Sequence, residues 1–114
     1  MHFDVVRADD NVTHVILVGR LDSAGVDGIA DRLTAQIVAR RKPAILDFDQ
    51  VDFVASIGMG MLLTIAKSLN RFGTRMVLLR PRSTVRESLN LAGFHRVILM
   101  AEDETSALEL LRGV

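Results

Sequence analysis

The sequence predicts an α/β fold: a mixed, mostly parallel sheet of about five strands, flanked by about four helices, in the order β-β-α-β-α-β-α-β-α. Short aliphatic and β-branched runs alternate with segments whose apolar residues recur at helical spacing. Two of the runs, residues 44–46 and 76–79, are apolar without alternation, as in parallel strands covered on both faces. A chain of 114 residues has room for one hydrophobic core, so we expect a single domain over residues 1–114.

The first third of the chain predicts a hairpin followed by a helix. Residues 3–6 and 14–18 are β-branched runs, and the Asp-Asp-Asn sequence between them is typical of a turn. Apolar residues then recur at helical spacing from Val26 to Val38, which predicts a helix over about residues 25–40. Pro43 follows, and proline disfavours helical backbone in the residue before it.

The middle third predicts a buried strand, a loop and a second helix. The strand of residues 44–46 continues into 47–49, and we expect a loop from Gln50 to Ala55. The helix should run from about Gly58 to Phe72 and end at Gly73. Its expected buried face consists of Leu62, Ile65, Ala66, Leu69 and Phe72.

The last third predicts two further strands, at residues 76–79 and 97–99, and two helices. One helix begins at Ser83-Thr84, where Thr84 with Glu87 fits a capping box, and Gly93 closes it. The other is an amphipathic helix over residues 103–112.

Composition excludes several classes of function. Fourteen basic residues balance fourteen acidic ones, so net charge gives no reason to expect nucleic acid or an anionic membrane as partner. Without cysteine there are no disulfides, thiolate nucleophiles or zinc–thiolate sites. The N-terminal residues lack the features of a signal peptide, and no apolar run could span a bilayer. We therefore expect a cytoplasmic protein with no direct insertion into a membrane.

In open α/β sheets, sites form where the strands end, and three loops occupy such positions: residues 19–25, 47–58 and 80–84. The middle loop carries Asp47, Asp49 and Asp52, which could form a metal or phospho-aspartate pocket of receiver type. Such a pocket needs further acids after the first strand and a lysine after the last, and both are missing. We therefore interpret the three acids as solvated residues at a strand end, with no metal site.

No catalytic centre can be assembled from the sequence. Ser56 lies in a sequence that resembles a nucleophile elbow without its first glycine. None of the three histidines, His2, His14 and His95, is placed by sequence near Ser56, and we expect edge or surface positions for them. Gly58-Met59-Gly60 is not followed by the Gly-Lys-Ser/Thr of a P-loop. We expect neither an enzyme nor a bound cofactor.

Ser56, just ahead of the second predicted helix, has two interpretations. Its hydroxyl could be the N-cap that accepts a hydrogen bond from a free helix N–H. It could instead be a phosphorylation site, because a helix N-terminus tolerates a phosphate. Met59 and Leu63 lie at the margin of the buried face and could form a docking surface, or another element could cover them.

The chain resembles the STAS domain of bacterial anti-sigma factor antagonists over nearly its whole length. The similar segments are Gly19-Arg20-Leu21-Asp22, Leu46-Asp47-Phe48 with the following Val51 to Val54, Ala55-Ser56-Ile57-Gly58, and Ser88 to Phe94. The resemblance implies a STAS fold, and a partner that is both anti-sigma factor and serine kinase of the histidine-kinase-like ATPase type. It also implies that a PP2C-type phosphatase reverses the phosphorylation.

The resemblance implies that Ser56 is the phosphate acceptor, since the family motif is Asp-Ser-Ser/Thr-Gly and its closing glycine corresponds to Gly58. The family aspartate is replaced by Ala55 and the second hydroxyl residue by Ile57. Both changes make the turn more apolar. They favour partner binding at this place over the phosphate switch.

The sequence thus predicts a binding surface at this turn, which we call the Ser56 surface. It comprises Asp22, Ser23, Ala55, Ser56, Ile57, Gly58, Met59 and Leu63. The first hypothesis is a partner-switching regulator. The alternatives are a constitutive STAS subunit of a larger assembly, such as a lipid-transport ATPase complex or a stress-signalling scaffold, and a small-ligand or nucleotide binder that uses the three loops.

Overall fold

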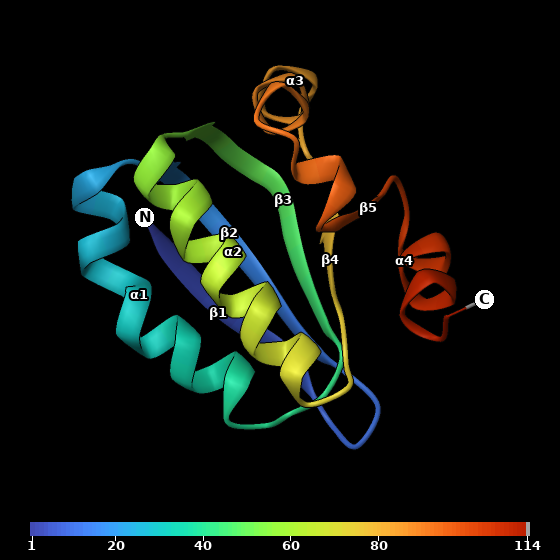
Figure 1. The fold of residues 1–114 in the computed structure, drawn as a ribbon. Coiled ribbons are helices and arrows are strands. Elements are labelled where there is room, and N and C mark those ends of the chain that lie inside the picture. The colour runs from blue at the N-terminus through green and yellow to red at the C-terminus, as the bar shows by residue number, and fades with distance from the viewer. Residues whose placement is uncertain (114) are drawn as a thin grey trace.

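The computed structural model describes residues 1–113, and Figure 1 shows their arrangement. Two strands, β1 and β2, precede a series in which helices and strands alternate. The elements are β1 (His2–Ala8), β2 (Thr13–Leu21), α1 (Ser23–Val38), β3 (Ala44–Val54), α2 (Ser56–Arg71), β4 (Met76–Leu79), α3 (Ser83–Leu91), the 3₁₀ turn η1 (Phe94–Arg96), β5 (Leu99–Ala101) and α4 (Glu104–Leu111).

The sheet has the strand order β1-β2-β3-β4-β5. β1 pairs with β2 in antiparallel fashion, as the hairpin prediction requires, and each later pair is parallel. This confirms the predicted α/β class, the mixed and mostly parallel sheet, and the order of elements. Because β2 to β5 run in one direction, their carboxyl ends lie together at one end of the sheet, which is the upper end in Figure 1.

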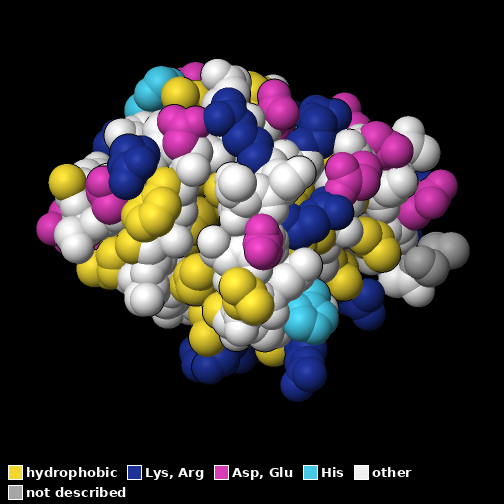
Figure 2. All heavy atoms as spheres, turned by 90° about the horizontal axis from the view of Figure 1, so that it is seen from above, with side chains coloured by type: hydrophobic (Ala, Val, Ile, Leu, Met, Phe, Trp, Pro, Cys, Tyr) yellow, Lys and Arg dark blue, Asp and Glu magenta, His cyan; other side chains and the backbone are white. Residues whose placement is uncertain are grey.

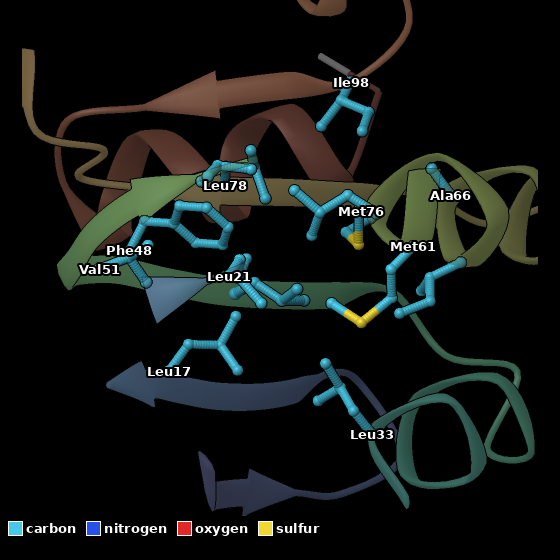
Figure 3. Close-up of a cluster of buried hydrophobic side chains, with 14 of the residues drawn as sticks. Leu17, Leu21, Leu33, Phe48, Val51, Met61, Ala66, Met76, Leu78 and Ile98 are labelled. Carbon is cyan, nitrogen blue, oxygen red and sulfur yellow. The ribbon is translucent and has the colours of Figure 1, made fainter. Parts of the chain in front are cut away.

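The two faces of the sheet carry different layers. Met76 and Leu78 of β4 belong to the larger core beneath α1, α2 and α3, whereas Val77 and Leu79 belong to a smaller core beneath α4. This alternation is the period of two expected when both faces of a strand are covered. Figure 3 shows the larger core, in which Met61 and Leu33 from the helices meet strand residues such as Leu17 and Phe48.

The predicted loop from Gln50 to Ala55 is wrong, because β3 continues to Val54. Register shifts in the pairing of β2 with β3 let the longer β3 stay paired past its polar residues. Val51 and Val54 point into the core while Asp52 and Phe53 are exposed. The polar residues that predicted a loop are thus the outward positions of a strand.

Two further predictions near helix and strand ends are corrected. Thr84 and Glu87 form no capping box, since α3 begins at Ser83 and its N-cap is Arg82. The last strand is residues 99–101 rather than 97–99, because Ile98 folds back in a turn, where its N–H donates to the Phe94 carbonyl at 2.8 Å. By contrast, Gly73 and Gly93 have the left-handed φ expected of residues just past helix ends.

Phe72 is not part of the core, contrary to the sequence prediction. The ring is 44% exposed, while Leu62, Ile65, Ala66 and Leu69 of the predicted face are buried. α2 ends at Arg71, so Phe72 no longer follows the helical rotation that would have turned it toward the sheet. The Arg41 guanidinium covers the ring at 4.2 Å from its centroid.

Candidate functional site

The turns after β2 and β3 lie side by side at the carboxyl end of the sheet. Leu21 pairs with Val54 in the register, and the Ala55 N–H donates to the Leu21 carbonyl at 2.9 Å. The residues that follow these strands are therefore neighbours. The structure thus brings Asp22 and the start of α1 close to Ser56 and the start of α2, as the predicted surface requires.

Ser56 is the first residue of α2 rather than its N-cap, which corrects one of its two interpretations. The N-cap is Ala55, whose backbone is extended (φ −84°, ψ 170°) and whose side chain cannot accept a hydrogen bond. The Met59 N–H donates to the Ala55 carbonyl at 3.0 Å, which closes the first helical turn. Within residues 1–113, no side chain caps this helix end, so the N–H groups ahead of Met59 stay available to an acceptor from outside. Ser56 itself is exposed.

Gly58 holds α2 against the end of β2. A Cβ atom on Gly58 would lie 2.7 Å from the Leu21 carbonyl oxygen and 2.8 Å from the Leu21 Cβ. Both are closer than real contacts allow, so only glycine permits this approach. Gly58 is buried, and its place in the Ser56 surface is to position Ser56 and Ile57 rather than to be reached by a partner.

Asp22 caps α1 next to Ser56. Its Oδ1 accepts a hydrogen bond from the Gly25 N–H at 2.9 Å, and this bond holds the pKa of the Asp22 carboxyl below its usual range. Arg20 adds a weaker contact, with Nε 3.5 Å from Asp22 Oδ2, and its guanidinium lies 4.5 Å from the centroid of the Phe53 ring. The Ser56 surface thus contains a fixed carboxylate beside the serine.

α2 presents different side chains on its two flanks. Because residues three and four apart share a side of a helix, Ser56, Met59 and Leu63 lie along one flank and Ile57 and Met61 along the other. Met59 and Leu63 are half-buried and pack against the core, so the larger part of each is covered. Ile57 is 45% exposed and lines, with Met61, a groove between α1 and α2.

One exposed apolar residue of this region, Phe53, is not among the predicted site residues; its side chain is 41% exposed. The sequence predicts a loop at this position, and a loop gives no orientation for the side chain. In the structure Phe53 of β3 pairs with Arg20 of β2, and Ile57 is the second residue of α2. The end of the molecule that contains Ser56 therefore has two exposed apolar side chains. Figure 2 looks onto this end and shows hydrophobic side chains among acidic and basic ones.

Two of the three acids of residues 47–52, Asp47 and Asp52, are paired with arginines, while Asp49 is exposed as expected. Asp47 is only 9% exposed, its Oδ1 accepts the Asp49 N–H at 2.9 Å, and its Oδ2 lies 3.6 Å from Arg80 Nη2. Arg82 forms an ion pair with Asp52 and donates to the Asp49 carbonyl. Arg80 and Arg82 thus connect residues 80–84 to the end of β3. The hollow beside Asp52 has a volume of about 60 Å³, far below the several hundred of a nucleotide site.

His14 is buried, which corrects its expected edge or surface position. It is 8% exposed and its Nδ1 lies 3.8 Å from Oε1 of Glu104, the first residue of α4. His2 and His95 are exposed, as expected. Within residues 1–113, no group of three or more histidine and acidic side chains could hold a metal ion. No helix in the same range is long and apolar enough to cross a membrane.

Comparison with known proteins gives consistent matches over nearly the whole chain. Residues 5–107 match the STAS domain family. The anti-sigma F factor antagonist of Lysinibacillus sphaericus is 26% identical over 115 residues, which cover 100% of this chain and 97% of that protein. The structure of the anti-sigma factor antagonist SpoIIAA in its unphosphorylated form has a TM-score of 0.78 at 25% identity, with 99% and 98% of the two chains covered. The Bacillus cell fate determinant SpoIIAA in its phosphorylated form has a TM-score of 0.70 at 23% identity, with 96% and 99% covered.

Proposed function

This chain belongs to the STAS domain family, and on that premise we propose that it binds an anti-sigma factor through the Ser56 surface. The resemblance predicted from the sequence is confirmed, and the chain is an anti-sigma factor antagonist-like STAS protein. In the proposal the anti-sigma factor is also a serine kinase of the histidine-kinase-like ATPase type. A PP2C-type phosphatase restores the free serine, and the exchange takes place in the cytoplasm.

The observation that carries the proposal is the exposed Ser56 at the uncapped start of α2. A kinase needs a hydroxyl that it can reach, and Ser56 lies on a turn at the surface. The N-terminus of α2 has free N–H groups and a partial positive charge, both of which favour a phosphate. Ser56 can therefore take a phosphate without unfolding the domain.

Phosphorylation would weaken partner binding through charge and desolvation. A phosphate adds about −1.5 to −2 charges, and it would stand beside the Asp22 carboxylate and the exposed Ile57 side chain. A partner that covers Ile57 would also have to remove water from the phosphate, which is costly. Release of the phosphorylated protein is the expected result.

The proposal is tested by incubating the protein with ATP and the anti-sigma kinase encoded nearest to its gene. We expect one phosphate, located on the peptide containing Ser56 by mass spectrometry. The variant Ser56→Ala should not be labelled, while Ser83→Ala, which removes the exposed first serine of α3, should be labelled like the unaltered protein. Labelling elsewhere, or none with a kinase that is active on another substrate, would refute the switch.

A second candidate function, a constitutive STAS subunit of a larger assembly, is favoured by the residues that flank Ser56. Ala55 offers no carboxylate where the family motif has aspartate, and Ile57 adds an exposed apolar side chain. Such a subunit would stay bound to its partner irrespective of ATP. Purification of the tagged protein from its source, with and without ATP, separates the two candidates.

A further inference from the structure

The end of the molecule opposite Ser56 carries a concentration of basic side chains. They follow α1, lie on the last turns of α2, and occupy the loop that leads to β4. We call this group the amino-end cluster, because it surrounds the amino ends of β3 and β4, at the bottom of Figure 1. Its members are Arg40, Arg41, Lys42, Lys67, Arg71 and Arg75.

Among the residues that the structure describes, the cluster has no acidic partner. Among residues 1–113, none of its side chains lies within 4.0 Å of a carboxylate, whereas Arg20, Arg80 and Arg82 at the other end each have an acidic partner. The turn between β1 and β2 lies at the same end of the sheet and carries Asp9 and Asp10, of which Asp9 pairs with Arg7. Like charges gathered without acids repel one another, which raises the free energy of the folded state.

The favourable interaction of cations with helix C-termini explains the positions of only some residues of the amino-end cluster. Cations stabilise the C-terminus of a helix, but the effect is limited to its last turn. It applies to Arg71, which is in the last turn of α2. Lys67 lies one turn earlier and Arg75 lies beyond the helix, so neither gains from it.

An apolar ring lies within the cluster. Phe72 is 44% exposed, and the guanidinium of Arg41 lies 4.2 Å from its centroid. Arg41 has a left-handed backbone (φ 54°), which residues other than glycine seldom adopt. The turn after α1 thus holds a cation against an exposed phenylalanine that the fold does not bury.

We propose that the amino-end cluster is a docking surface for an anionic phospholipid membrane. Negative headgroups balance the unpaired cations, and each lysine or arginine near such a surface contributes to binding. The boundary between headgroups and acyl chains accommodates a phenylalanine ring. A nucleic acid would supply the negative charge alone, whereas a lipid surface supplies negative headgroups with an apolar layer directly beneath them. The binding is peripheral and reversible.

The test is co-sedimentation of the protein with vesicles of phosphatidylcholine that contain phosphatidylglycerol, at low salt. We expect binding to these vesicles, none to vesicles of phosphatidylcholine alone, and release as salt is raised. Lys67→Gln/Arg71→Gln should weaken binding about 25-fold, or about fivefold for each cation removed. Phe72→Ala should also weaken it, although the charge is unchanged. Circular dichroism verifies that each variant is folded.

The matched control is Arg32→Gln/Arg96→Gln, which removes the same charge from exposed positions outside the cluster. It should bind the anionic vesicles like the unaltered protein. Equal loss in both double variants would overturn the proposal, because net charge alone would then govern binding. Failure to bind at low salt, or binding of duplex DNA in preference to the anionic vesicles, would overturn it as well.

Discussion

The two ends of the sheet differ in how their charges are arranged. At the carboxyl end, Arg80 and Arg82 pair with Asp47 and Asp52, and Asp22 is fixed as the cap of α1. At the amino end, the cluster around Arg41 and Arg71 contains cations that have no acidic partner within residues 1–113. The carboxyl end is therefore a locally balanced and partly apolar surface, suited to a specific protein partner. The amino end is suited to a partner with an extended anionic surface.

The difference shows what a net charge of zero conceals. Equal numbers of acidic and basic residues predicted no electrostatic partner. That inference treats the charge as evenly spread, whereas the fold brings residues 40–42 and 67–75 to one end. Net charge describes the whole chain, and a docking surface depends on the local field.

The largest expected effect is on the free energy of unfolding, when Phe48 or Phe72 is replaced by alanine. The sequence predicts that Phe72 belongs to the core. Phe48→Ala should lower the free energy of unfolding by about 3–5 kcal/mol, because its ring is fully buried. Phe72→Ala should cost about 1 kcal/mol or less, since it loses a half-exposed ring and its contact with Arg41. Urea unfolding measures both. Equal losses would mean that Phe72 belongs to the core and is not free for an outside surface.

The next effect tests the close packing at the carboxyl end with two glycines of α2. Gly58→Ala should cost about 1–3 kcal/mol, because its Cβ would overlap the backbone of Leu21. Gly60→Ala, two residues further along the same helix and on its other side, should stabilise the protein by about 0.5–1 kcal/mol, since its Cβ would meet nothing within 4 Å. Thermal unfolding of the two variants measures both changes in stability. A neutral Gly58→Ala would show that α2 does not rest on β2 in this way.

The smallest expected effect is a loss of stability at acid pH. It differs between Asp9, at the amino end of the sheet, and Asp22, at the carboxyl end. The Arg7 side chain and two backbone N–H groups lower the pKa of Asp9 from 3.8 to about 2, while the Gly25 N–H lowers the pKa of Asp22. Carboxyls whose pKa is lower in the folded state stabilise it above their unfolded value, and this contribution is lost as the pH falls through the folded pKa.

Unfolding midpoints should therefore decrease between about pH 4 and pH 2. Asp9→Asn should flatten that decrease more than Asp22→Asn, because the pKa of Asp9 is lowered to about 2. Identical acid profiles for the two variants and the unaltered protein would contradict these assignments.

The order and type of the elements could be predicted from sequence, because alternation and helical spacing are local properties. Residues 76–79 read as a buried strand on their own, and β4 occupies them. The end of β3 could not be predicted, because Gln50 and Asp52 face solvent only once β2 pairs alongside. Where such a strand ends depends on pairing with residues that are distant in the sequence.

Contacts between residues distant in the sequence also determine details of the candidate site that the sequence does not predict. The position of Ser56 near the start of a helix followed from the glycines and the apolar spacing, whereas its exact role at that start did not. Ala55 became the N-cap because its N–H bonds to Leu21, a residue far away in the sequence. Likewise, buried His14 lies against Glu104 of α4, which comes from the other end of the chain.

The central claim, that Ser56 controls partner binding at the carboxyl end, is tested most directly by affinity. Binding of the anti-sigma factor to Ser56→Asp and Ser56→Ala is measured by calorimetry against the unaltered protein. We expect Ser56→Asp to bind about tenfold more weakly or worse, because its carboxylate adds a charge to an apolar contact. Ser56→Ala should bind like the unaltered protein. Equal affinities of the aspartate and alanine variants would contradict the account.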